Sequence, residues 1–143
     1  MSFLYEYDDG GRAAAGFKGS AGDCGVRAAA IATEQPYYKV YEWINEIAQA
    51  EQPIRGKRSN ARTGIFRKTL NTFMEEQGFL WTPTMGIGTG CTVHLTPHEL
   101  PGGRIVARVS KHFVAVVDGV VHDTYDPTRD GTRCVYGYWK KEA

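Results

Sequence analysis

No apolar run in this sequence approaches the ~20 residues that a helix needs to cross a bilayer. The N-terminal segment is acidic and aromatic, so it lacks the basic start and the apolar stretch of a signal peptide. The net charge of +1 creates no strong field toward nucleic acid or an acidic membrane. These absences predict a cytoplasmic protein with neither a membrane nor a nucleic acid as its partner, and they specify no oligomeric state.

Cysteine is scarce, and its spacing suits neither cross-links nor metal binding. The three cysteines are Cys24, Cys91 and Cys134, and an odd number without a secretion signal argues against a disulfide framework. No pair has C-x-x-C spacing, and His94 and His98 lie in a segment with two prolines and two glycines, which does not suit a helical zinc-binding pair. We therefore expect no metal and no cofactor, and we interpret Cys91 and Cys134 as packing residues.

What the sequence does contain is a block of helical patterns followed by a block of strand patterns. Apolar residues at helical spacing, with Pro and Gly at the ends, predict helices over residues 24–33, 36–52 and 65–77. Alternating or β-branched runs predict strands over residues 79–85, 104–110, 112–117, 120–125 and 133–139, with a short one within residues 3–7. Helices followed by an antiparallel sheet indicate an α+β fold, and the length of 143 residues predicts a single domain over 1–143.

A thiol stands at the predicted start of the first helix, in the stretch GDCGVRA. A helix N-terminus carries unpaired N–H groups and a partial positive charge, which favour a thiolate at Cys24. Asp23 is a candidate N-cap for this helix. If its carboxylate does not turn away to cap, its negative charge beside the sulfur raises the thiol pKa and opposes the helix.

The strongest local pattern is a hairpin around Asp118-Gly119, a dipeptide typical of two-residue turns. With that turn, the alternation of side chains places His112 and Asp123 on the same face of the sheet, as diagonal neighbours. Asp126 falls on the opposite face. The register therefore predicts a His–Asp pair formed by His112 and Asp123.

A cysteine at a helix start, a histidine and an acid are the parts of a thiol hydrolase. The histidine takes the thiol proton and later protonates the leaving group, while the acid orients the imidazole. The backbone N–H of Cys24 is placed to donate to the oxyanion. We predict acyl transfer by Cys24, His112 and Asp123 through an acyl-thioester, with a peptide or protein as substrate.

This order of parts resembles the papain-like cysteine peptidase superfamily, on the stretches GDCGVRA, KHFVAVVDG and VVHDTYDP. The resemblance implies a nucleophile that starts a central helix, with His and Asn or Asp on adjacent strands of the following sheet. The last stretch is also similar to that of bacteriocin-processing peptidases, where DP follows the second strand, and this favours Asp126 where the register favours Asp123. The runs GDC..RA.AIAT, RTG and RCVYGYW resemble small phage and bacterial proteins of papain-like type, which implies a phage-encoded protein in the host cytoplasm.

The chain departs from the papain pattern in one respect. Papain-type enzymes carry a Gln several residues before the Cys to complete the oxyanion hole, but residues 17–23 read FKGSAGD. Either Ser20 or a glycine backbone amide is the substitute donor, or the oxyanion hole is incomplete. The missing Gln keeps open a second interpretation, a catalytically inactive papain-like domain that binds a protein partner.

Other polar residues near the cysteine have two interpretations each. Arg27 lies one turn into the helix, where it pairs with Asp23 or holds a substrate carboxylate, and we favour the pairing. Ser20 and Asp23 are weaker candidates for contact with substrate. The basic run 55–62 has no interleaved aromatic residues, so we interpret it as a solvated loop, with contact to phosphates as the alternative.

Overall fold

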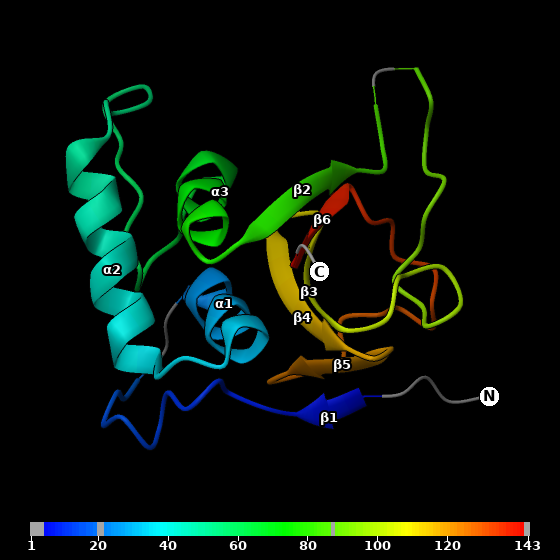
Figure 1. Ribbon diagram of the computed structural model, residues 1–143, viewed down its shortest axis with the longest axis horizontal. Helices are drawn as coiled ribbons and strands as arrows, with labels where there is room; N and C mark the ends of the chain where they lie inside the picture. Colours follow the sequence, from blue (N-terminus) through cyan, green and yellow to red (C-terminus); the bar gives the residue numbers. More distant parts are fainter. Residues whose placement is uncertain (1–4, 20–21, 87, 142–143) are drawn as a thin grey trace.

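A helical layer packs on one face of a curved sheet in the computed structural model, which describes residues 5–19, 22–86 and 88–141 (Figure 1). Within these ranges the three helices are α1 (Cys24–Thr33), α2 (Tyr37–Ala50) and α3 (Arg67–Glu76). The six strands are β1 (Tyr5–Tyr7), β2 (Phe79–Pro83), β3 (Arg104–Val109), β4 (His112–Val117), β5 (Val120–Asp123) and β6 (Gly137–Lys141), in the order β1-β5-β4-β3-β6-β2. The predicted α+β class is confirmed as a mixed fold of three helices and one six-stranded sheet.

The helices form where the sequence has apolar residues at helical spacing. α1 has the predicted bounds, and its alanines are buried against β3 and β4. α2 begins directly after Pro36, whose missing N–H is tolerated in a first turn, and it buries a stripe that includes Val40 and Ile44. α3 begins at Arg67 and packs against α2. No helix in the described ranges is long and apolar enough to cross a membrane.

The hairpin predicted around Asp118-Gly119 is present, and its register is the predicted one. The β4–β5 ladder ends at the pair Ala115–His122. Beyond that pair the two strands no longer form a ladder. His112 stands at the other end of β4, where the strand still pairs with β3 through Val109.

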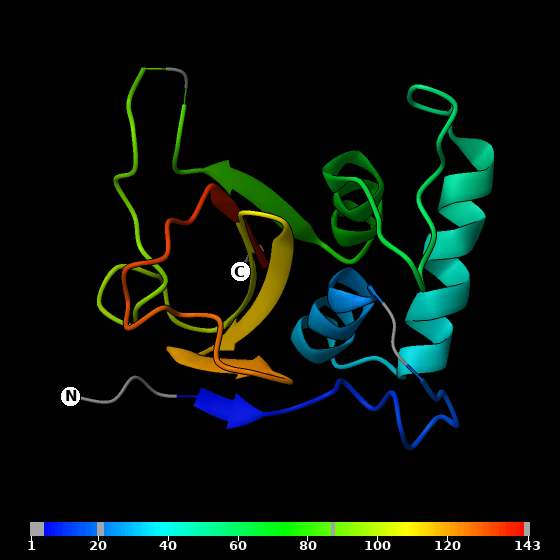
Figure 2. The same ribbon diagram turned by 180° about the vertical axis from the view of Figure 1, so that it is seen from behind.

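One strand departs from the predicted antiparallel arrangement. β1 lies at the edge of the sheet and runs parallel to β5, with Tyr5 opposite Val121 and Tyr7 opposite Asp123 (Figures 1 and 2). A parallel pair has no tight turn between its strands, so no local pattern in the sequence signals it. The pairing places the N-terminal segment beside the end of β5.

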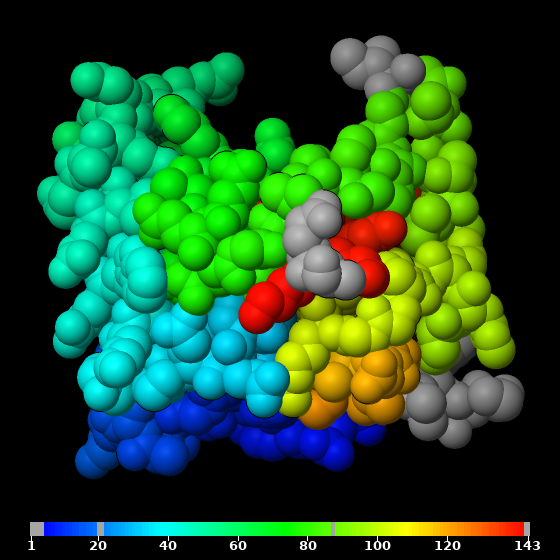
Figure 3. All heavy atoms as spheres, viewed as in Figure 1, coloured from blue at the N-terminus to red at the C-terminus, as the bar shows by residue number. Residues whose placement is uncertain are grey.

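The face of the sheet away from the helices is covered by two long loops, residues 84–103 and 124–136 (Figure 2). The first loop stands out from the body at one side in the space-filling view (Figure 3). The last strand begins at Gly137, later than predicted, because residues 133–135 pair with residues 93–95 of the other loop.

A disulfide bond joins these two loops. It links Cys91 to Cys134, whose Cα atoms lie 5.8 Å apart although the residues are 43 positions apart in the sequence. The interpretation of both as packing residues was therefore wrong. An odd cysteine count does not prevent one pair from forming with one thiol left over, and Cys24 is the free cysteine.

Candidate active site

The first residue of α1, the first residue of β4 and the last residue of β5 meet in space. They are Cys24, His112 and Asp123. Nε2 of His112 lies 2.6 Å from Oδ2 of Asp123, and the thiol of Cys24 hydrogen-bonds with the imidazole. Because Nε2 faces the carboxylate, Nδ1 is the ring nitrogen left for the sulfur. The structure thus brings together the three residues predicted to carry the chemistry.

The two candidate acids have different surroundings. Asp123 is buried, with 4% of its surface exposed, and is bonded to the imidazole of His112. Asp126 is exposed, and one of its oxygens accepts a hydrogen bond of 2.9 Å from the backbone N–H of Thr128. The structure places Asp123 on the histidine, as the hairpin register predicted, and leaves Asp126 outside the cluster.

The charges around the sulfur favour a thiolate beside an imidazolium. Burial raises the pKa of the Cys24 thiol, whereas the hydrogen bond and the positive charge of His112 lower it. A hydrogen bond from the backbone N–H of Phe113 and the charge of Arg27 lower the thiol pKa further, so it lies below its ordinary value. Burial lowers the pKa of His112, but its bonds to Asp123 and Cys24 raise that pKa to about 9. At neutral pH these shifts favour the charged pair.

Asp23 is not the side-chain cap that its position predicted. Its carboxylate is buried and makes no capping hydrogen bond to α1. It accepts hydrogen bonds from Arg27 and the Tyr37 hydroxyl, and it lies 3.0 Å from Nε of Arg12. Two guanidinium groups offset its negative charge, which explains why an anion next to Cys24 does not keep the thiol pKa high.

Arg27 connects this buried cluster to the acid of the site. While one of its amino groups binds Asp23, Nη2 lies 3.6 Å from Oδ1 of Asp123. The backbone N–H of Thr124 donates to the same oxygen at 2.7 Å, and the hydroxyl of Tyr5 donates to the backbone carbonyl of Asp123 at 3.1 Å. Asp23, which is buried, and Arg27, which is half-buried, therefore form the pair that we favoured, and neither lines the groove beside the sulfur.

A groove of about 340 Å³ opens beside Cys24. One of its walls is the segment 63–67, which follows the basic run of the sequence. Two glycines let this segment approach the start of α1. A Cβ on Gly25 would collide with the side chain of Ile65, and a Cβ on Gly22 would lie 2.8 Å from a backbone oxygen of the segment.

The described residues that line the groove include no Gln and no Asn. The backbone N–H of Cys24 lies in the first helical turn, where it has no acceptor within the helix, and this N–H is the donor left for an oxyanion. Ser20, the predicted substitute for the missing Gln, lies outside the described residues. In the described ranges, no group of three or more His, Cys, Asp and Glu side chains is arranged to hold a metal ion.

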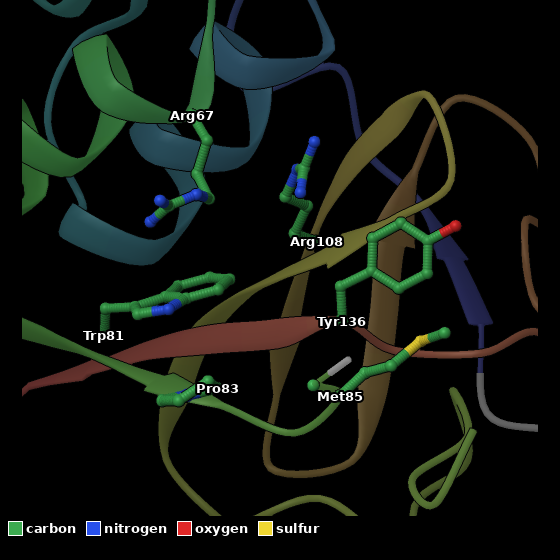
Figure 4. A pocket seen from close by; sticks show the side chains of 7 residues that line it. Arg67, Trp81, Pro83, Met85, Arg108 and Tyr136 are labelled. Carbon is green, nitrogen blue, oxygen red and sulfur yellow. The ribbon is translucent and has the colours of Figure 1, made fainter. Parts of the chain in front are cut away.

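A second pocket of about 440 Å³ adjoins the groove, and we did not predict it from the sequence (Figure 4). Arg67 and Arg108 line both hollows, and Trp81 and Tyr136 line the second one. One feature of the sequence did indicate a polar site on this side of the sheet. In the strand RIVARV, Arg108 alternates with Val106, which is fully buried, so a charge stands on the core-facing side of the strand.

The chain matches no model of a known protein family, no curated protein and no solved structure. The papain-like resemblance therefore rests on short motifs and on the order of the three residues. The geometry and the charges of the site are the observations that bear on function.

Proposed function

We propose that the protein is a thiol hydrolase, most simply a cysteine peptidase or amidase of papain-like type. In this proposal Cys24 is the nucleophile, His112 the general acid and base, and Asp123 the acid that orients the imidazole. The observation that carries it is the bonded series of these three side chains, with the thiol pKa lowered and the imidazole pKa raised to about 9. A cysteine that only fills a core needs neither partner nor shift.

The first step forms an acyl-enzyme. Sγ of Cys24 attacks the carbonyl carbon of an amide, a C–S bond forms, and an electron pair moves to the oxygen, which the N–H of Cys24 stabilises. When this intermediate collapses, the C–N bond breaks. The imidazolium of His112 gives its proton to the departing nitrogen, so the amine leaves neutral.

The second step consumes one water molecule. The neutral imidazole of His112 takes a proton from water, the oxygen attacks the thioester carbon, and the C–S bond breaks. Cys24 departs as a thiolate and His112 keeps the proton, which restores the starting ion pair. Asp123 stabilises the imidazolium at both stages because it accepts the hydrogen bond from Nε2.

The missing Gln favours a second candidate function. The described residues that line the groove include no Gln or Asn to complete an oxyanion hole of the papain type, so the hole depends on other donors, such as the backbone N–H of Cys24. A catalytically inactive papain-like domain, in which the oxyanion of either step is poorly stabilised, would act as a protein-binding module. The two candidates differ in whether an acyl group on Cys24 is released.

The test measures the reactivity of one thiol. Because Cys91 and Cys134 are joined, iodoacetamide under non-reducing conditions has Cys24 as its only free cysteine. At about pH 6 an ordinary thiol is almost fully protonated, so we expect Cys24 to react at least about tenfold faster than free cysteine. His112→Ala should remove most of this advantage, while alanine at the exposed His98 should leave it unchanged.

A second measurement separates the enzyme from the binding module. With p-nitrophenyl acetate, the enzyme should release p-nitrophenolate over many turnovers, and mass spectrometry should show a transient acetyl group on Cys24. An acetyl group that stays on Cys24 would support the binding module. The proposed ion pair would be contradicted if Cys24 is alkylated at about pH 6 no faster than free cysteine and at the same rate in the His112→Ala variant.

A further inference from the structure

The pocket beside the groove contains two arginines that have no acidic partner among the described residues (Figure 4). Arg67 lies at the start of α3 and Arg108 in β3, and both also line the groove that contains Cys24. The guanidinium of Arg67 lies 5.1 Å from the ring centroid of Trp81, and that of Arg108 lies 5.5 Å from the ring centroid of Tyr136. Stacking on a ring face orients a guanidinium and leaves its N–H donors free at the edge.

The charge of the two joined hollows is positive. Lys111 lines the groove as well, and the described residues that line either hollow include no Asp and no Glu. A guanidinium offers paired N–H donors that match the two oxygens of a carboxylate. Charge and donor geometry therefore both select an anionic group.

The surface beneath the two guanidiniums is apolar, and a glycine without a side chain leaves room for the indole ring that forms part of it. A Cβ on Gly137 would collide with the indole ring of Trp81 and would lie 2.9 Å from the carbonyl oxygen of Thr82, so the indole lies directly against β6. Pro83 and Met85 extend this surface at the rim of the pocket (Figure 4). A ligand with a carboxylate on a short hydrocarbon stem fits both the charge and the apolar surface.

We propose that this pocket binds a carboxylate-bearing part of the substrate whose acyl carbon is attacked by Cys24. The carboxylate binds Arg67 and Arg108, and its stem packs on Trp81. The inference rests on the proposed function, because it takes the occupant of the pocket to be the substrate of Cys24. An acidic side chain and a C-terminal carboxylate share this chemistry, and the experiment distinguishes them.

The experiment measures binding to a Cys24→Ala variant, so it does not depend on turnover. Three probes are titrated while NMR follows the indole N–H of Trp81 and the Nε–H of Arg67 and Arg108. N-acetylglutamate α-amide carries a side-chain carboxylate, N-acetylglutamine carries a terminal one, and N-acetylglutamine α-amide carries neither. We expect saturable shifts at these N–H groups, and at least about tenfold tighter binding of a carboxylate probe than of the neutral one.

Two substitutions and a matched control test whether the two arginines bind the carboxylate. Arg67→Gln and Arg108→Gln should each weaken binding of the carboxylate probe about tenfold, to the level of the neutral probe. Lys68→Gln removes the same charge from the next position of α3 and should leave binding unchanged. The backbone spectrum of each variant reports whether it is folded, and Arg67 is exposed, so its replacement is expected to be tolerated.

The outcomes have separate consequences for the pocket and for the enzyme. Tighter binding of the glutamate probe assigns the pocket to an acidic side chain, and tighter binding of N-acetylglutamine assigns it to a chain terminus. Equal binding of all three probes, no saturable shift, or unchanged binding in both arginine variants would overturn the inference. Octathymidylate is titrated in addition as a nucleic-acid probe, and tighter binding of it than of either carboxylate probe would also overturn the inference. If a carboxylate binds but Cys24 of the wild type alkylates like an ordinary thiol, the proposed function fails while the anion site remains.

Discussion

The two faces of the sheet are covered in different ways. On one face, three helices bury a large core that contains aromatic side chains such as Phe73 and Trp139. On the other face, two loops cover a smaller aliphatic core with Leu95 and Val135 (Figures 1 and 2). Helices satisfy their own backbone hydrogen bonds, whereas these loops are held by scattered hydrogen bonds, by the short pairing of residues 93–95 with 133–135 and by a disulfide bond.

The candidate site lies where the helical layer meets the ends of the strands, and the ring of the loop residue Tyr125 lies 5.3 Å from that of His112. Cys24, His112 and Asp123 stand at the ends of a helix and two strands, where regular hydrogen bonding holds the backbone. Asp126, the rival acid, lies only three positions after Asp123 but already belongs to a loop. The difference indicates that the chemistry depends on regular elements, which position side chains more precisely than loops do.

The largest effect should come from replacing the acid of the site, with the same replacement at the rival acid as the comparison. Asp123→Asn leaves the imidazole without the carboxylate that stabilises its charged form, so turnover of p-nitrophenyl acetate should fall by roughly 10²- to 10⁴-fold. Asp126→Asn, which alters a loop residue outside the cluster, should change turnover less than about twofold. A loss in the Asp126→Asn variant equal to that of Asp123→Asn would contradict the placement of the acid.

The two cores can be compared with one chemical change in each. Leu70 on the helical face and Leu95 under the loops both have 0% of their surface exposed. Leu→Ala at either position should lower the free energy of unfolding by about 2–5 kcal/mol, measured by urea titration. Only Leu95→Ala should also change Met85 and Tyr136 signals in NMR spectra, because the loops carry these pocket residues.

Breaking the disulfide tests whether the loop face is independent of the site. The double variant Cys91→Ser, Cys134→Ser should lose about 2–4 kcal/mol of unfolding free energy. The rate of Cys24 alkylation at about pH 6 should stay the same, since neither cysteine of the disulfide lines the groove that contains Cys24. A double-mutant cycle should show coupling of the disulfide to Leu95→Ala and near additivity with Leu70→Ala. Slower alkylation in the serine variant would show that the two faces are linked.

The smallest effect concerns the titration of the imidazole. Cys24 raises the pKa of His112 through a hydrogen bond and through the charge of the thiolate. In Cys24→Ala, the pKa of His112 should therefore fall below about 9, as followed by the imidazole Cε1–H shift in NMR. The same two groups set the pH dependence of amide turnover by the wild type. Turnover should rise with pH as the thiol ionises, below its ordinary pKa. It should decline near pH 9, where the imidazolium loses the proton that the leaving amine needs.

The parts of the site that could be predicted are those with local signals in the sequence. α1 begins at Cys24 as expected, since the helix pattern and its start depend on residues within one or two turns. His112 and Asp123 were paired correctly because a two-residue turn sets the register of the hairpin that carries them. The pairing of Asp23 with Arg27 was predicted, but its contacts with Arg12 and Tyr37 were not, because those side chains come from segments that no local pattern places beside α1.

Local patterns were enough to specify the three helices and the β4–β5 hairpin, whose strands carry the histidine and the acid of the site. Periodicity and turn chemistry act between near neighbours, so they can be read directly from the order of residues. Three features needed the assembled fold: β1 runs parallel to β5, Cys91 meets Cys134, and Arg67 and Arg108 share a pocket. These contacts join distant positions, such as Tyr5 and Asp123 at a separation of 118 residues, and they form only when the whole sheet and its helical layer are in place.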